Sequence, residues 1–199
     1  QIISEPSWWG GNPDLKPEES ISYELGFDHS LNYGIQLYGS VYQTKVDNLM
    51  VSDASTGFKF YNQKKATFTG SELGLKWKQD SLFANAEYAY VQPKNDDTDK
   101  DAPPNRPRQN FTLSAGWDNG VYGFTTSLVA KGPSKDVQEI PGYATIDMNA
   151  YWQINPHIKV FSNIHNLGDT TYKAAWNNEV SSYYLASGRL ATAGVTFRY

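Results

Sequence analysis

The sequence contains no cysteine, no long apolar run and no cluster of basic residues. The absence of cysteine excludes disulfides, thiol catalysis and cysteine-ligated metals. The absence of any run of about 18 apolar residues excludes a transmembrane helix. A formal net charge of −4, with lysine and arginine scattered along the chain, argues against a nucleic-acid partner.

Residues for enzymatic chemistry are also missing. For the three histidines, His29, His157 and His165, no serine or carboxylate partner is expected at a matching end of a strand, so no hydrolytic site is expected. The acidic run at residues 95–105 lacks the glycine and glutamate spacing of a calcium loop and is expected to be a solvated loop. We therefore expect no enzyme, no cofactor and no metal site.

Aromatic residues are abundant instead, at 15% of the chain, with 14 tyrosines and 6 tryptophans. Tyrosine combines an apolar ring with a polar hydroxyl, which suits a boundary between lipid and water. The mean hydropathy of −0.59 is typical of a soluble protein. A transmembrane β-barrel has a similar value, because its lipid-facing and lumen-facing side chains alternate, so composition leaves both classes open.

Apolar residues recur at every second position along the chain, and no helical period competes with this pattern. The last run is the clearest, with apolar residues at alternate positions: Ala191, Ala193, Val195, Phe197 and Tyr199. The pattern predicts an all-β chain with nine strands, at residues 20–31, 34–50, 59–79, 82–93, 108–118, 121–131, 142–153, 157–167 and 189–199. Phe83 and Phe161 place bulky rings on the otherwise polar face, so the phase is least clear in their strands.

The expected connections alternate between short turns and long polar segments. Short turns are expected at residues 29–33, 79–82, 118–121 and 155–157, and long segments at 47–57, 92–106, 132–142 and 168–188. Outer-membrane barrels have short periplasmic turns and longer extracellular loops. The alternation therefore favours such a barrel over a soluble β-sandwich, which has no reason to gather its long loops at one end.

Nine strands do not close a bacterial barrel, because single-chain barrels have an even number of strands. An open sheet in lipid would leave unpaired backbone groups that cost several kcal/mol each. The first residue, Gln1, is not a methionine, and no signal peptide follows it. We therefore expect a transmembrane antiparallel β-barrel, of which residues 1–199 form about nine C-terminal strands.

Four segments resemble patterns of the TonB-dependent outer-membrane receptors. NPDLKPEESISYELGF, which begins at Asn12, resembles the family's Asn-Pro-x-Leu-x-Pro-Glu turn and the Glu-x-Gly strand that follows it. YNQKKATFTGSELGLKW, PGYATIDMNAYWQIN and NIHNLGDTTY resemble three later patterns, with matches at Asn62, Gly70, Glu72, Asp147, Asn166, Leu167, Asp169 and Tyr172. Gly168 stands where the last pattern usually has phenylalanine, so one aromatic contact is lost.

The resemblance implies a barrel of about 22 strands in the outer membrane of a Gram-negative bacterium, enclosing an N-terminal plug domain. It implies TonB-dependent uptake of a ferric siderophore, haem or cobalamin, with this chain as part of the wall and the ligand-binding loops. TonB would act through the plug, which this sequence lacks. Outer-membrane lipid and the ligand are the expected partners, and colicins or phages often exploit such receptors.

The first of these segments has a simple physical explanation. Pro13 and Pro17 each fix their own φ and bias the residue before them to extended backbone. The result is a preset turn that leads from a long loop into the first strand, which is the favoured interpretation. Direct ligand contact by Asp14 or Lys16 is the alternative.

Ten residues on the expected long-loop side are candidates for ligand contact: Trp8, Trp9, Tyr61, Lys131, Tyr172, Lys173, Trp176, Tyr183, Tyr184 and Arg189. Aromatic faces suit catechol, porphyrin or corrin rings, and cations suit anionic complexes. The same aromatic residues also fit a girdle at the lipid interface. The resemblance implies that a haem receptor carries a loop histidine as an axial ligand of the iron. No histidine falls on the long-loop side, so a siderophore is favoured, with haem and cobalamin behind. A soluble carbohydrate-binding β-sandwich is the alternative of another class.

Three carboxylates, Glu24, Glu72 and Asp147, fall on the polar face at positions that match the family patterns. They are candidates for contact with cationic residues of the plug. The favoured interpretation is that they face hydrated lumen or a neighbour such as Lys76 or Arg198.

Overall fold

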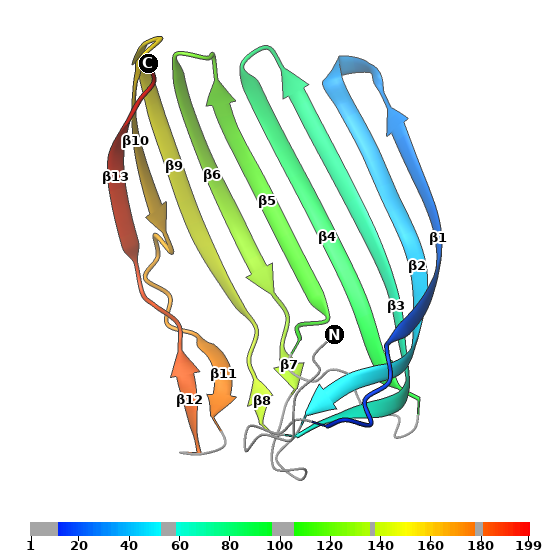
Figure 1. Cartoon of the computed structure of the whole chain (residues 1–199). Coiled ribbons are helices and arrows are strands. Elements are labelled where there is room, and N and C mark those ends of the chain that lie inside the picture. Colours follow the sequence, from blue (N-terminus) through cyan, green and yellow to red (C-terminus); the bar gives the residue numbers. More distant parts are fainter. Residues whose placement is uncertain (1–11, 53–58, 97–105, 136–137, 178–180) are drawn as a thin grey trace. The chain divides into compact units, whose positions relative to one another are not determined.

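The structure is a computed structural model that describes residues 12–52, 59–96, 106–135, 138–177 and 181–199. Its main element is a nine-stranded sheet in the order β1-β2-β3-β4-β5-β6-β9-β10-β13 (Figure 1). The strands are β1 (Glu19–Ser30), β2 (Ile35–Ser52), β3 (Phe60–Gln79), β4 (Leu82–Asn95), β5 (Gln109–Asp118), β6 (Tyr122–Lys131), β9 (Tyr143–Asn155), β10 (Ile158–His165) and β13 (Leu190–Phe197). A single 3₁₀ turn, η1 (Asn32–Gly34), connects β1 to β2 among the described residues.

The nine strands predicted from the alternation are confirmed, with ends that differ by at most two residues. Four further strands lie inside the segments expected to be long loops. They form two separate ladders, β7 (Ser134–Lys135) with β8 (Glu139–Ile140), and β11 (Lys173–Asn177) with β12 (Ser182–Leu185). Strands of two to five residues are too short to produce a detectable period, which explains why the sequence did not predict them.

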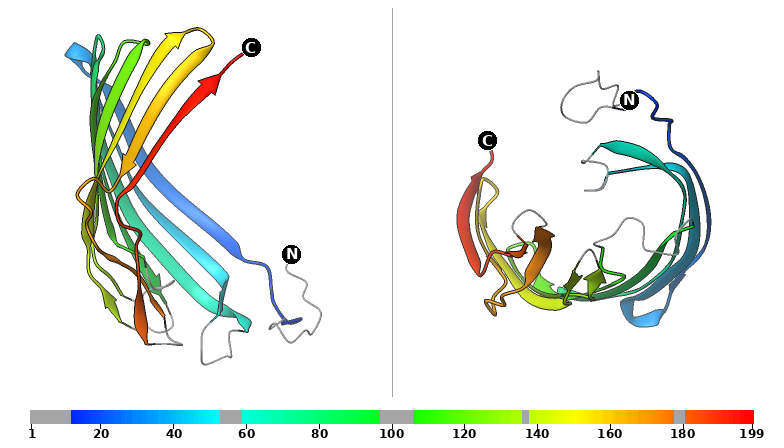
Figure 2. Two further views of the ribbon diagram at one scale, coloured as in Figure 1. Left: turned by 90° about the vertical axis from the view of Figure 1, so that its left-hand side faces the viewer. Right: turned by 90° about the horizontal axis from the view of Figure 1, so that it is seen from below.

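The chain consists of two compact units, and each is described separately. The first comprises Gln1–Leu25, Val41–Gly70 and Val91–Pro104, and the second comprises Gly26–Ser40, Ser71–Tyr90 and Asn105–Tyr199. Within the second unit, each of the strands from β5 to β13 pairs antiparallel with its neighbours in the sheet. Figure 2 shows these strands, β5, β6, β9, β10 and β13, curving from one to the next.

The sheet has almost no buried core among the described residues, where Ala66, Pro93 and Ile140 are the buried apolar side chains. Large apolar side chains are instead exposed on alternate positions of the strands, as shown by Leu25, which is 75% exposed, and Phe197, which is 69% exposed. A soluble β-sandwich would bury these side chains against a second sheet. In a membrane-spanning sheet the same apolar face contacts lipid.

No helix in the described part of the chain is long and apolar enough to cross a membrane.

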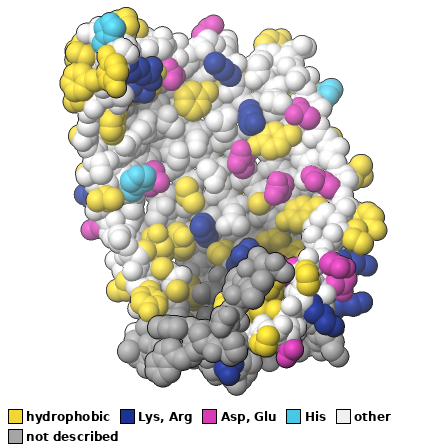
Figure 3. Space-filling model, in the orientation of Figure 1, with side chains coloured by type: hydrophobic (Ala, Val, Ile, Leu, Met, Phe, Trp, Pro, Cys, Tyr) yellow, Lys and Arg dark blue, Asp and Glu magenta, His cyan; other side chains and the backbone are white. Residues whose placement is uncertain are grey.

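The opposite, polar face of the strands is called the lumen face here. Figure 3 shows one face of the molecule, on which charged side chains are dispersed among hydrophobic side chains and the backbone and other groups drawn in white. Ser114 and Ser127, which are partners in the β5–β6 register, share a hydrogen bond of 2.9 Å on the lumen face. The side-chain amide of Asn149 donates to Asn163 across β9 and β10 in the same way.

Phe83 and Phe161, whose phase was unclear from the sequence, lie on the lumen face over glycines of the neighbouring strand. Phe83 pairs with Gly116 and Phe161 with Gly194 in the sheet register. A Cβ at either glycine would come within 2.6 Å of the opposing ring. Each ring thus lies over the space that its paired glycine leaves free, and the nine-strand assignment holds without a shift of register.

In the first unit, Asn62 of β3 fastens the segment that precedes β1. Its Oδ1 accepts a hydrogen bond from the Lys16 backbone N–H at 2.7 Å, and its Nδ2 donates to the Lys16 carbonyl at 3.0 Å and the Asn48 carbonyl at 2.6 Å. Glu18 adds a second attachment, because its Oε1 accepts from the Met50 backbone N–H at 2.6 Å. These contacts support the structural interpretation of the proline-rich turn.

Candidate ligand-binding loop and lumen wall

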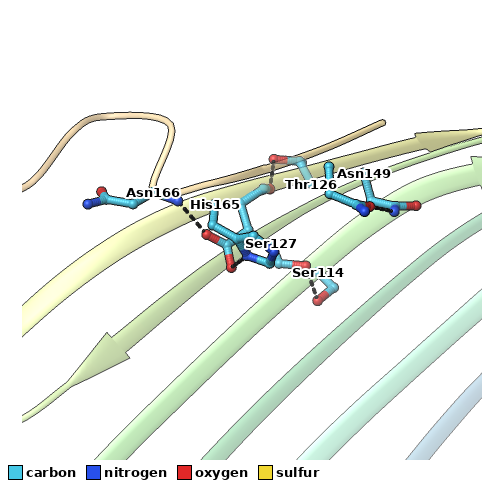
Figure 4. Close-up of polar contacts among 8 residues, drawn as sticks. Ser114, Thr126, Ser127, Asn149, His165 and Asn166 are labelled. Atoms are coloured by element: carbon cyan, nitrogen blue, oxygen red, sulfur yellow. Dashed lines mark hydrogen bonds and ion pairs between the residues drawn. The ribbon is translucent and has the colours of Figure 1, made fainter. Parts of the chain in front are cut away.

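The segment between β10 and β13 is fastened to the wall where β10 ends. Asp147 of β9 accepts a hydrogen bond from the Asn166 backbone N–H at 2.8 Å, and its other oxygen lies 3.4 Å from Nδ1 of His165 (Figure 4). Asn166 has a positive φ of 52° and exchanges two hydrogen bonds with the Thr170 backbone. Asp147 and Asn166 therefore fix the direction in which the chain leaves the sheet.

A second aspartate brings the far end of this segment back to the same place. Asp169 Oδ1 accepts a hydrogen bond from the Arg189 backbone N–H at 2.7 Å. Gly188 leaves room for this contact, because a Cβ there would lie 2.6 Å from the same oxygen. Asn166 and Asp169, which match the last family pattern, thus hold the base of the loop through hydrogen bonds. These bonds do not need the phenylalanine that usually stands at the position of Gly168.

Beyond this base, two groups of side chains are together called the aromatic loop cluster: the pair Tyr143 and Tyr172, and the set Lys173, Trp176 and Tyr183. Tyr143 and Tyr172 are stacked with ring centroids 3.7 Å apart. Trp176 and Tyr183 meet edge to face at 4.8 Å, and Lys173 Nζ lies 3.6 Å from the centre of the Tyr183 ring. The cluster therefore combines several aromatic surfaces with one ammonium group.

The cluster is attached to the neighbouring β7–β8 ladder. The Tyr183 hydroxyl donates to the carbonyl of Glu139 in β8 at 3.2 Å, and β11 contacts β8. Burial, followed by the neighbouring Tyr143, raises the pKa of the Tyr172 phenol. Tyr172 is therefore a neutral hydrogen-bonding group at physiological pH, and Lys173 supplies the positive charge of the cluster.

The structure brings together only some of the ten predicted contact residues. Tyr172, Lys173, Trp176 and Tyr183 are in the cluster, and Lys131 is the register partner of Tyr143 at its edge. Tyr184 follows Tyr183 on β12 and is 55% exposed, and Arg189 is exposed and attached through its backbone. Tyr61 lies in β3 in the first unit. Trp8 and Trp9 lie outside the described residues.

Tyr143 was not among the predicted contact residues, although it occupies the Pro-Gly-Tyr pattern of the resemblance. The alternation identified it only as the beginning of a strand. Its stacking partner, Tyr172, is distant in the sequence, so no local pattern indicated the pair.

The three lumen carboxylates have surroundings that differ from one another. Lys76 lies 4.8 Å from the centre of the Tyr38 ring and forms no ion pair with Glu72, which has no ion-pair partner among the described residues. Arg198 contacts His157 through backbone groups. Asp147 is engaged at the loop base, and Glu24 is exposed on β1. Among the described residues these carboxylates form no ion pair with Lys76 or Arg198, which leaves the hydrated lumen, the other option of the favoured interpretation.

Glu72 borders a recess in the second unit with a volume of about 340 Å³. Its polar lining includes Tyr38, Glu87, Asn110 and Thr112. Among the residues that the structure describes, no three His, Asp or Glu side chains are grouped so that they could hold a metal ion. The recess combines two carboxylates, Glu72 and Glu87, with polar and apolar side chains.

Comparison with known proteins identifies the fold and its family. Residues 3–167 match the family model described as "TonB dependent receptor-like, beta-barrel". The chain belongs to this family. The predicted family and the predicted barrel are thereby confirmed, and the members of the family are receptors of the Gram-negative outer membrane.

The relatives of this TonB-dependent receptor chain differ in their ligands. It is 26% identical to the vitamin B12 transporter BtuB of Vibrio vulnificus (strain YJ016), over 95% of this chain and 31% of the relative. The ferric enterobactin receptor PfeA of Pseudomonas aeruginosa has a similar structure, with a TM-score of 0.77, 19% identity and coverage of 94% of this chain and 32% of that protein. The copper transporter OprC has a TM-score of 0.76, with 18% identity over 92% of this chain and 32% of that one. The chain thus spans about a third of the length of these relatives.

Proposed function

We propose that the receptor containing this chain takes up a ferric siderophore or a similar iron complex across the outer membrane in a TonB-dependent manner. This chain supplies part of the barrel wall and a ligand-contacting loop. The aromatic loop cluster is the observation that carries the proposal. Family membership supports the transport class, and the chemistry of the cluster supports the ligand class.

The side chains of the cluster suit an anionic complex with aromatic groups. Catecholate rings pack against tyrosine and tryptophan faces, and an ammonium group attracts the negative charge of a ferric catecholate. Lys173 is held over Tyr183, and Trp176 meets the same ring, so cation and aromatic surfaces are presented together. The fastened base at Asp147 and Asp169 limits the loop's freedom before binding, which reduces the entropic cost of association.

Cobalamin is the second candidate, favoured by the similarity to the vitamin B12 transporter BtuB. A corrin ring also packs against aromatic side chains, so the cluster does not discriminate between the two ligands by shape alone. Haem receives less support. His157 contacts the Arg198 carbonyl at a short turn, and His165 lies beside Asp147 at the loop base.

The plug is the proposed partner of the lumen face. Glu72 has no ion-pair partner among the described residues and borders the recess, so it is suited to an arginine or lysine of the plug. TonB would act through the plug. Binding of a bacteriocin or phage to the loops stays a prediction.

The proposal is tested by removing the aromatic loop cluster in the full-length receptor. Replacing Trp176 and Tyr183 together with alanine removes two ring faces and the support of Lys173, and we expect the Kd for ferric enterobactin to rise at least about tenfold, equivalent to about 1.4 kcal/mol. Tyr33→Ala is the matched control, because it removes a tyrosine that is 87% exposed in η1, at a short turn.

Binding is measured by tryptophan fluorescence quenching or calorimetry, with cyanocobalamin as the second probe. An affinity for ferric enterobactin that is equal in all variants would remove the cluster from the binding site. Binding of cyanocobalamin alone, lost in the double variant, would transfer the proposal to cobalamin.

A further inference from the structure

Tyr38 of β2 crosses a whole strand on the lumen face to reach a carboxylate. Its ring passes over Gly74 of β3, where a Cβ would collide with the ring, and its hydroxyl donates to Glu87 Oε1 of β4 at 2.6 Å. β2, β3 and β4 are successive neighbours in the sheet. The hydrogen bond therefore connects two strands that share no backbone ladder.

Tyr151 of β9 repeats this arrangement at another place in the second unit. Its ring passes over Gly123 of β6, where an added Cβ would again collide, and its hydroxyl donates to Asp118 Oδ1 at the end of β5 at 2.6 Å. β5, β6 and β9 are also successive neighbours. The same three elements, a tyrosine, a glycine and a carboxylate, thus occur on three adjacent strands twice.

A lysine lies over each of these tyrosine rings. Lys76 Nζ is 4.8 Å from the centre of the Tyr38 ring, and Lys159 Nζ is 3.8 Å from that of Tyr151. Phe83 and Phe161 also cover glycines, but they have no hydroxyl with which to reach a third strand, and Tyr42 covers Gly70 in the first unit. Among the rings that cover glycines in the described part of the second unit, Tyr38 and Tyr151 are therefore the two that reach a carboxylate on a third strand.

We propose that Tyr38 and Tyr151 act as staples that lock the barrel wall across three strands. A backbone ladder joins only adjacent strands, whereas each staple restrains the strand between its two ends against shear and bending. Hydrogen bonds to an ionised carboxylate are about twice as strong as neutral ones, and a ring held flat between a glycine and a lysine loses little further entropy. The staples raise the stability of the folded barrel against unfolding. They do so independently of the ligand loop.

A mutant cycle in the full-length, detergent-purified receptor tests this proposal. The variants are Tyr38→Phe, Glu87→Ala and the double variant, with Tyr151→Phe as the second staple. Tyr122→Phe is the matched control, because it removes a hydroxyl that forms no hydrogen bond with the described residues and keeps a stacked ring. The measurement is the temperature at which the compact band on an unboiled gel converts to the unfolded band.

We expect Tyr38→Phe, Glu87→Ala and Tyr151→Phe each to lower this temperature, the double variant to lower it no further than the worse single one, and Tyr122→Phe to leave it unchanged. Ligand affinity of the folded fraction should be equal in all of them. Additive shifts in the cycle, or no shift for the tyrosine variants, would overturn the proposal. Gly74→Val and Gly123→Val should destabilise more strongly, and the phenylalanine variants decide the outcome if these fail to fold.

Discussion

Replacing Asp147 with alanine is expected to release the ligand loop and to weaken ligand binding by at least about tenfold. The carboxylate accepts the Asn166 backbone N–H at 2.8 Å and lies beside His165, so its removal weakens the attachment of the beginning of the loop, which keeps the bond from the Leu167 N–H to the Ile146 carbonyl at 2.7 Å. A hydrogen bond to a charged group contributes about 1.5–3 kcal/mol, and about 1.4 kcal/mol corresponds to tenfold in affinity. The loop must then be ordered at the expense of binding free energy.

Asp28→Ala is the control for this prediction. Asp28 is also a wall carboxylate with a hydrogen-bond partner, Gln36, but it lies at the short-turn end of β1. Affinity is measured with ferric enterobactin, and hydrogen exchange at residues 166–177 reports the release directly. Unchanged affinity together with unchanged exchange in Asp147→Ala would show that the loop is held by other contacts.

Replacing Asn62 with alanine is expected to detach the segment before β1 and to destabilise that end of the first unit by about 2 kcal/mol. Asn62 makes three hydrogen bonds, two to the backbone of Lys16 and one to Asn48, and a typical net contribution is about 1 kcal/mol for each. The sum is reduced because two of these bonds are exposed to solvent. The readout is hydrogen exchange at the Lys16 amide, which should become rapid.

Two variants calibrate the Asn62 prediction. Asn62→Asp retains the acceptor for the Lys16 N–H and should keep part of the protection. Gln43→Ala, which removes a single long contact of 3.4 Å to Thr69 in the same unit, should have little effect. Full protection of Lys16 in Asn62→Ala would mean that Glu18 and the prolines hold the turn without Asn62.

The sequence predicted the strands well because lipid imposes a strict period of two on one face. Leu25 and Phe197 are exposed on that face, so their positions reveal the strands without any knowledge of contacts. Phe83 and Phe161 interrupt the pattern, because a large ring fits on the lumen face where the neighbouring strand has a glycine beneath it. That compensation involves the neighbouring strand and is invisible within a single one.

The candidate site was predicted only in part, because its contacts join distant segments. Trp176 and Tyr183 were recognised as aromatic residues of a long loop, but their hairpin and its attachment to Glu139 depend on the position of β8. Lys76 was expected beside a carboxylate and lies over Tyr38 instead, where Gly74 admits the ring. The position of Lys76 thus depends on a ring and a glycine of other strands, which charge alone does not indicate.

Uptake of labelled iron by cells that produce the full-length receptor tests the central claim most directly. The account predicts saturable, TonB-dependent uptake of iron supplied as ferric enterobactin, which is strongly reduced when Trp176 and Tyr183 are both alanine and preserved in Tyr33→Ala. Uptake that is unaffected by loss of the aromatic loop cluster, or that is absent although the receptor is folded in the outer membrane, would contradict it.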